Sequence, residues 1–253
     1  MKLISAYLSD IGVKRSQNQD SAGLSMENAL FIVADGMGGH QGGEVASQMA
    51  VSLISQSVND TLKSAPLTPA DELIVQAVRS ANQAILKKSR ETPQLAGMGT
   101  TVTVLHFSDG KAWIGQVGDS RCYLIRDEGV YQLTRDHSLV QEKLRAGMIA
   151  RHETKTDKMK NVITRSVGFD PQLAVDIFEY EPQDGDLFLM CSDGLSGPVD
   201  DYEIHRFAKE HVLNQRQTQE DHLKNCISKL IDSANQKGGD DNVTVMMTRY
   251  SQK

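Results

Sequence analysis

Four acidic sites in this 253-residue chain lie where a short apolar run meets a glycine-containing turn. Asp35 ends the run Ala-Leu-Phe-Ile-Val-Ala, and Asp193 ends Leu-Phe-Leu-Met-Cys-Ser. Asp119 follows Gln-Val-Gly, and the pair Asp240 and Asp241 precedes Asn-Val-Thr-Val. Short apolar runs bounded by turn residues are typical of buried strands. The pattern therefore predicts carboxylates fixed at strand ends, where the edge of a sheet can bring them together.

Such a group of carboxylates indicates a metal centre. Carboxylates gathered without lysines or arginines repel one another, and a bound dication removes that repulsion. Oxygen-only ligation suits Mg²⁺ or Mn²⁺, and neighbouring glycines let backbone carbonyl oxygens come close. Each aspartate alone is explained equally well as an ordinary turn residue. Four of them in the same setting favour the metal centre.

The sequence lacks the motifs of several other classes of catalytic site. There is no GxxxxGK[ST] phosphate loop, no GxSxG elbow and no cysteine followed six residues later by arginine. The turn containing Asp184 and Asp186 follows a polar segment, so it does not resemble an acyl-phosphate site. Cys122, Cys191 and Cys226 are far apart in the sequence, which excludes a zinc-type Cys cluster and favours a reducing compartment.

The distribution of apolar residues favours an α+β layered sandwich over a doubly wound parallel sheet, because the strands come in antiparallel groups with helices between them. Residues 1–253 are expected to form a single domain. A glycine-rich loop is predicted at 36–43, and Thr68 is the predicted cap of the second helix. Helices are predicted over residues 45–58, 68–88 and 223–234. Strands are predicted at 3–8, 29–34, 100–107, 112–117, 121–125, 174–180, 186–191 and 242–248.

Charge and hydropathy restrict partners and location. The net charge of -6 gives no reason to expect nucleic acid or an anionic membrane as a partner. No stretch approaches the roughly 18 apolar residues of a membrane helix, so we expect a soluble, cytoplasmic protein. Residues 151–160 are highly charged and almost free of apolar side chains, which predicts an exposed flap.

Six short motifs, in this order, resemble those of the PPM family, the metal-dependent, type 2C protein serine/threonine phosphatases. They lie at residues 15–20, 33–39, 99–101, 118–121, 192–194 and 239–242. Residues 136–139 and 161–165 resemble the bacterial branch. The similarity extends from about residue 9 to 248, and its specificity comes from the order and spacing of the motifs.

The resemblance implies a four-layer αββα sandwich of two antiparallel sheets, with a flap at about 142–168. It implies hydrolysis of phosphoserine and phosphothreonine by a water that bridges two Mg²⁺ or Mn²⁺ ions. Asp35, the Gly36 carbonyl, Asp193 and Asp241 would hold these ions. Asp119, together with Asp193, would hold a third, weaker ion.

The resemblance also assigns residues around the metals. Arg15 would bind the substrate phosphate, and Asp20 would orient a metal-bound water. Gln19 and Asn242 would support the site from behind the ligands. Gln19 stands where other members have glutamate, which weakens one water contact. Met37 stands where animal relatives have a histidine suggested as general acid.

Partners and rival functions follow from the same resemblance. Phosphorylated proteins are the expected substrates, opposed to a cognate bacterial Ser/Thr kinase, and a monomer is expected. A non-catalytic pseudophosphatase, or a hydrolase of small phosphorylated metabolites, stays open as an alternative. A phospho-receiver domain would be about half this length.

The flap departs from the family pattern at two positions. Asp157 and Lys158 replace a His-Pro pair frequent in the family, which affects the expected conformation of the flap. The basic flap residues do not separate these functions; they are Arg151, Lys155, Lys158 and Lys160.

Overall fold

The computed structural model describes residues 1–252 apart from 155 and 216, and the side chains of 39–41 are also outside the description. Lys155 of the predicted flap therefore lies outside the described residues. The strands are β1 (Lys2–Asp10), β2 (Asp20–Ser25), β3 (Leu30–Met37), β4 (Gly99–Thr100), β5 (Val102–Ser108), β6 (Lys111–Val117), β7 (Arg121–Arg126), β8 (Gly129–Gln132), β9 (Asp176–Tyr180), β10 (Leu187–Cys191) and β11 (Val243–Ser251). The helices are α1 (Gly39–Ser64), α2 (Ala70–Glu91), α3 (Leu139–Arg145), α4 (Asp193–Ser196), α5 (Asp201–Ala208) and α6 (Glu220–Gln236). Short 3₁₀ turns lie at Pro93–Leu95 and Arg151–Glu153, and a π turn at Lys209–Leu213.

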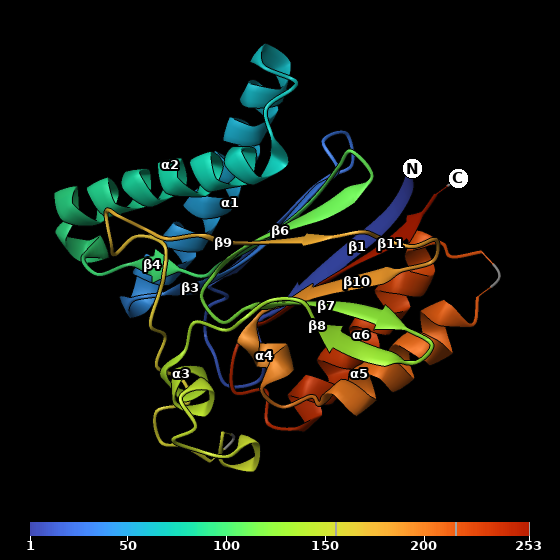
Figure 1. Cartoon of the computed structure of the whole chain (residues 1–253). Helices are drawn as coiled ribbons and strands as arrows, with labels where there is room; N and C mark the ends of the chain where they lie inside the picture. The colour runs from blue at the N-terminus through green and yellow to red at the C-terminus, as the bar shows by residue number, and fades with distance from the viewer. Residues whose placement is uncertain (155, 216, 253) are drawn as a thin grey trace.

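Two antiparallel sheets form the centre of the molecule. One has the strand order β1-β11-β10-β7-β8, and the other has β2-β3-β5-β6-β9 with β4 paired to β3. The helices α1 and α2 cover the second sheet, whereas α5 and α6 cover the first (Figure 1). This arrangement confirms the predicted four-layer α+β sandwich.

Three apolar cores separate the four layers. The core between the sheets contains Phe107, whose ring lies 5.3 Å from that of Phe188 and 6.1 Å from that of Phe31. A second core joins α1 and α2 to their sheet, and a third joins α5 and α6 to theirs. Along β5, Val104 faces the helices and Leu105 faces the other sheet. Because both faces of the strand are buried, its apolar residues are not confined to alternate positions, and the polar Thr103 and His106 are buried with them.

The helix faces follow the predicted spacing. In α1, Ala46, Ala50, Ile54 and Val58 recur every fourth residue and are fully buried. Residues four apart lie on one side of a helix, so this stripe packs on the second sheet. The apolar residues of α6 pack on the first sheet in the same way.

The structure corrects several sequence predictions. The segment 36–43 is not a loop throughout, because β3 continues to Met37 and α1 begins at Gly39. Of the three strands predicted between 100 and 125, β5 and β6 form an antiparallel hairpin, whereas β7 leaves their sheet and pairs with β10 and β8. Pro69, not Thr68, is the N-cap of α2, and the Thr68 hydroxyl donates to the Ala65 carbonyl.

The flap projects from the body of the sandwich beside α3 (Figure 1). Its two ends are joined at the base, where the Leu139 amide donates to the Val162 carbonyl and the Thr164 amide donates to the His137 carbonyl. Inside the flap, Lys143 forms an ion pair of 2.9 Å with Asp157. No helix among the described residues is long and apolar enough to cross a membrane.

Candidate metal centre

The predicted aspartates lie near one another at one end of the two sheets. The antiparallel register of β2 and β3 places Asp20 opposite Asp35. Asp193 begins α4 immediately after β10, and Asp241 lies two residues before β11, which pairs with β10. Asp119 lies in the turn between β6 and β7, where the chain passes from one sheet to the other. Residues from four separate parts of the sequence are thus brought together.

Burial raises the pKa of these carboxyl groups. The pKa of Asp20 and that of Asp119 are each raised to about 7, first by loss of water and then by neighbouring aspartates, with hydrogen bonds partly opposing the shift. The pKa values of Asp35 and Asp193 are raised by the same two causes. The side chains of Asp35 and Asp193 lie within hydrogen-bonding reach of each other. The folded chain holds these negative charges close together at a cost in free energy.

Three carboxylate oxygens in this cluster have no hydrogen-bond partner although they are buried. They are the Oδ1 atoms of Asp20, Asp119 and Asp193. A buried carboxylate oxygen without a partner is unfavourable, so native proteins rarely leave one in that state. Within the described part of the chain, no three His, Cys, Asp or Glu side chains converge closely enough to hold a metal ion. The donor chemistry nevertheless fits a hard dication, because the donors are oxygens and Asp20, Asp119 and Asp193 each keep one buried oxygen without a partner among the described residues.

Arg15 lies at the mouth of this cluster. Its Nη2 donates to Asp241 Oδ2 over 2.7 Å, and its Nε donates to the Asp240 carbonyl over 3.3 Å. Half of the Arg15 side chain is exposed, at 50%. An exposed guanidinium beside the half-buried carboxylate of Asp241 can contact a phosphate group that approaches from solvent.

Asn242 fixes the loop that carries Arg15. Its Nδ2 donates to the carbonyls of Ile11 and Gln17, each over 2.9 Å, and its Oδ1 accepts from the Gln19 amide over 2.8 Å. The loop is thereby bound to the segment that supplies Asp241. Asn242, for which a supporting role is predicted, thus makes three hydrogen bonds to the segment that carries Arg15.

Glycines let the backbone approach closely at two points. A Cβ on Gly36 would lie 2.0 Å from the Gly43 carbonyl oxygen, and a Cβ on Gly194 would lie 2.0 Å from the Asn242 carbonyl oxygen. A side chain at Gly36 or at Gly194 would therefore displace a segment that carries a predicted site residue. The Gln19 side chain lies near Gly43, whose added Cβ would be 2.8 Å from Gln19 Oε1.

Ser192 contacts the site although no role is predicted for it from the sequence. Its hydroxyl donates to Asp20 Oδ2 over 2.7 Å and accepts from the Thr244 amide over 3.0 Å. Ser192 therefore links Asp20 on one sheet to β11 on the other. The sequence signal for this role is that Ser192 directly precedes Asp193, a predicted metal ligand.

Asp136 and His137 hold the turn that contains Asp119. Arg121 forms a bidentate pair with Asp136, with a shortest distance of 2.6 Å. His137 contacts Gly118 twice: its Nδ1 accepts from the Gly118 amide over 3.0 Å, and its own amide donates to the Gly118 carbonyl over 2.9 Å. The motif at residues 136–139 indicates the bacterial branch of the family, but it does not predict the contact between His137 and Gly118.

Comparisons with known proteins bear on this arrangement. The family model for protein phosphatase 2C matches residues 13–232. The serine/threonine phosphatase stp of Listeria monocytogenes serotype 4b is 36% identical over 245 residues, which cover 95% of this chain and 93% of that protein.

Solved structures agree with the family match. The Mycobacterium tuberculosis serine/threonine phosphatase PstP/Ppp has a TM-score of 0.85 and 33% identity, covering 99% of both chains. The catalytic domain of PstP in complex with two manganese ions has a TM-score of 0.84 and 33% identity, with the same coverage.

The fold and these similarities define a metal-dependent phosphoprotein hydrolase. The chain belongs to the protein phosphatase 2C family, and it is a serine/threonine phosphatase of that type. The predicted resemblance is confirmed.

Proposed function

We propose that this chain hydrolyses phosphoserine and phosphothreonine in proteins at a centre of two Mg²⁺ or Mn²⁺ ions. Asp35, the Gly36 carbonyl, Asp193 and Asp241 would hold the two ions, and Asp119 with Asp193 would hold a weaker third. The observation that carries the proposal is the cluster of aspartates beside an exposed arginine, in which three buried carboxylate oxygens have no partner among the described residues. The manganese complex of the related PstP catalytic domain supports it.

Binding of two such cations would supply a water of lowered pKa and neutralise charge on the phosphoryl oxygens. The chain's own residues then perform the remaining tasks. Arg15 turns from Asp241 toward the substrate and binds two phosphate oxygens. Asp20, held by Ser192, accepts a hydrogen bond from the attacking water and orients it. The water oxygen bonds to phosphorus as the phosphorus–oxygen ester bond breaks, inorganic phosphate is released, and the serine or threonine oxygen receives a proton.

Met37 cannot supply that proton, because a thioether does not titrate. It lies at the end of β3, where it pairs with Gly99. We therefore propose that the leaving oxygen is protonated by water in the centre rather than by a side chain at this position.

The activity test is phosphate release from a phosphothreonine peptide, with Mn²⁺ added or with excess EDTA. We expect release with Mn²⁺, none with EDTA and none from Asp193→Asn. Release from a small aryl phosphate but from no phosphopeptide would favour a metabolite hydrolase. No release from any substrate would favour a pseudophosphatase, although no predicted metal or phosphate residue is replaced in this chain.

We also propose the biological setting expected from the sequence. The substrates would be phosphoproteins of a cognate Ser/Thr kinase, and the enzyme would act as a monomer in the cytoplasm. The three cysteines are buried free thiols, which is consistent with a reducing compartment. Co-purification with its kinase and the mass of the protein in solution would test the partner and the monomer.

A further inference from the structure

A buried glutamine lies beside the turn that carries Asp119. Gln116 is on β6, and none of its surface is exposed. Its alternate neighbours Ala112 and Ile114 belong to the apolar core between the sheets, so residue 116 faces the same layer. An apolar side chain would extend that core, whereas a buried amide is unfavourable unless it is hydrogen-bonded. The contacts of Gln116 therefore show what an amide does at this position.

The Gln116 carboxamide contacts the chain on both sides of Asp119. Its Nε2 donates to the Gly118 carbonyl over 3.0 Å and to the Ser120 carbonyl over 2.6 Å. Its Oε1 accepts from the hydroxyl of Thr103, the residue opposite it on β5, over 2.8 Å. Both donors and the oxygen of the amide are thus used. One side chain therefore fixes the carbonyl groups before and after Asp119.

A second contact connects the same turn to Asp35. The Ser120 hydroxyl lies 2.7 Å from the Thr101 hydroxyl, and both residues are fully buried. Thr101 Oγ1 accepts from the Asp35 amide over 2.9 Å, and the Thr101 amide donates to the Asp35 carbonyl over 2.8 Å. The backbone of Asp35 is therefore connected to the turn of Asp119 through two hydroxyl groups.

The Asp119 carboxylate takes no part in these contacts. Its Oδ1 atom is buried and has no hydrogen-bond partner among the described residues. The backbone before it is closely packed, since a Cβ on Gly118 would lie 2.6 Å from the Thr101 Cβ. The turn is thus held firmly, while the carboxylate that it presents keeps an oxygen for a ligand.

We infer that Gln116, together with Ser120, is a positioning residue that sets the place of the Asp119 carboxylate relative to Asp35, an inference that rests on the third ion of the proposed function. A weakly bound ion gains most from ligands that are already in place, because ordering them costs free energy when the ion binds. Loss of Gln116 should therefore affect the weaker ion far more than the two core ions.

Counting bound Mn²⁺ on the full chain tests this role. The electron paramagnetic resonance of free Mn²⁺ gives the number of ions and the affinity of each class. Gln116→Met should weaken the weakest ion at least about tenfold, as is typical of residues that orient metal ligands, and should change the tighter ions less than about twofold. Ser120→Ala should act in the same direction, and it decides if Gln116→Met does not fold.

A second measurement needs no metal. Amide hydrogen exchange in EDTA reports on the turn through the Gly118 amide, which donates to His137 Nδ1 over 3.0 Å. We expect this amide to exchange at least about fivefold faster in Gln116→Met, because hydrogen bonds that hold the turn are lost. The amides of α6 serve as the reference for a general loss of stability.

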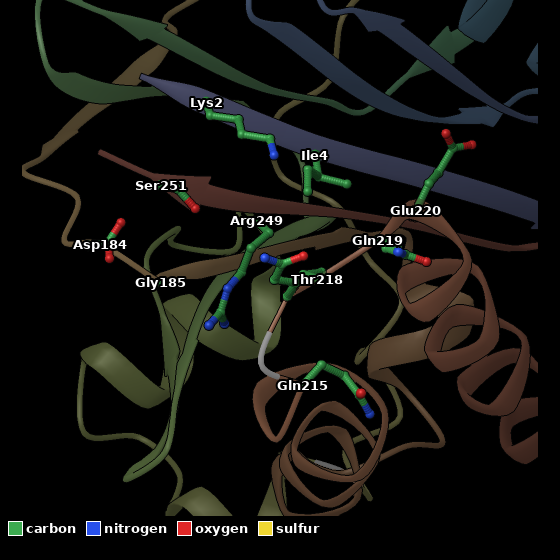
Figure 2. Close-up of a pocket in the computed structure, with 11 residues that line it drawn as sticks. Lys2, Ile4, Asp184, Gly185, Gln215, Thr218, Gln219, Glu220, Arg249 and Ser251 are labelled. Carbon is green, nitrogen blue, oxygen red and sulfur yellow. The ribbon is translucent and has the colours of Figure 1, made fainter. Parts of the chain in front are cut away.

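Ser5→Ala is the matched control. Ser5 is a buried serine whose hydroxyl lies 2.9 Å from that of Thr248, and it is in the half of β1 away from the aspartates. The preceding residue, Ile4, lines a hollow of about 860 Å³ (Figure 2), and no predicted site residue is among the described residues of that lining. We expect Ser5→Ala to cause no selective loss of any ion.

Failure of this inference and failure of the proposed function give different results. Fewer than three ions in the wild type would contradict the proposed third ion, and the positioning role with it. Three ions in the wild type, with the same affinities in Gln116→Met and Ser120→Ala, would overturn the positioning role alone. Unchanged exchange at Gly118 in Gln116→Met would do the same. An equal loss of all ions, seen also in Ser5→Ala, would overturn it because only general stability would have changed.

Discussion

At the scale of single residues, the ion pair of Arg15 and Asp241 joins the proposed phosphate-binding residue to a proposed metal ligand. In the structure, Arg15 donates to Asp241, which is also a proposed metal ligand. The same carboxylate oxygen cannot serve an arginine and a cation equally well. If both residues have the proposed roles, Arg15 and the metals would compete for Asp241 until a phosphate group draws Arg15 away.

This competition predicts different effects of two substitutions. Arg15→Ala should raise the KM for a phosphopeptide while leaving Mn²⁺ affinity unchanged or higher, because it removes a competitor for Asp241. Asp241→Asn should lower Mn²⁺ affinity, because it removes a ligand. Calorimetric titration with Mn²⁺ and steady-state kinetics measure both quantities. Equal losses of Mn²⁺ affinity in the two variants would contradict the proposed roles.

Asn242 gives a second prediction at this scale. Asn242→Ala removes three hydrogen bonds that hold the Arg15 loop. Each such bond contributes about 0.5–1.5 kcal/mol to the free energy of unfolding. We expect a lower free energy of unfolding and a KM raised more than kcat is lowered. Denaturant unfolding and kinetics test this, with Asn59→Ala on α1, a half-buried asparagine outside the site, as control. An unchanged KM would show that the loop is held by other contacts.

At the scale of elements, the close approach of α4 to the segment before β11 positions Asp193 beside Asp241. Gly194 permits it, since a Cβ would lie 2.0 Å from the Asn242 carbonyl. Gly194→Ala should therefore destabilise the chain by more than about 4 kcal/mol, or prevent folding. Gly110→Asn is the matched control, because Gly110 has a φ of +75° in open space and asparagine tolerates that conformation. A stable Gly194→Ala variant with normal Mn²⁺ affinity would contradict this account.

The sequence predicted those elements whose residues are buried on one or both faces. The apolar runs of β3 and β10 and the fourfold repeat of α1 are such signals. The strand β2 was missed because its six residues are mostly half-buried and few are strongly apolar. The start of α1 was missed because its glycines suggest a loop.

The sequence likewise predicted only part of the candidate site. Aspartates at strand ends carry a local signal, and the family motifs added their proposed roles. The contact of Ser192 with Asp20 joins residues 172 positions apart, and no local pattern predicts such a pair. The contact of His137 with Gly118 likewise depends on how β7 crosses between the sheets.

At the scale of the whole molecule, the cluster of aspartates couples stability to pH. The pKa of Asp20 and that of Asp119 are raised to about 7 in the folded chain, well above the unfolded value of 3.8. The folded chain therefore binds more protons than the unfolded chain, and its stability falls as pH rises through 7. The buried His106 and His137 have lowered pKa values, so their opposite effect lies below pH 6.5.

The expected result is a melting temperature that falls between pH 6.5 and pH 8 in EDTA. Saturating Mn²⁺ should remove this decrease, because ligand binding to the folded state stabilises it. Thermal unfolding followed by circular dichroism measures both curves. Asp119→Asn should reduce the decrease in EDTA. A melting temperature that rises from pH 6.5 to pH 8 without metal would contradict the coupling.

The central claim, that the aspartates hold the metal ions of the reaction, is tested most directly by counting bound Mn²⁺. Equilibrium dialysis or the electron paramagnetic resonance of free Mn²⁺ gives the number of ions per chain. We expect at least two in the wild type, fewer or much weaker ones in Asp193→Asn, and no change in Asp60→Asn on the exposed end of α1. Equal Mn²⁺ binding in the wild type and Asp193→Asn would contradict the account.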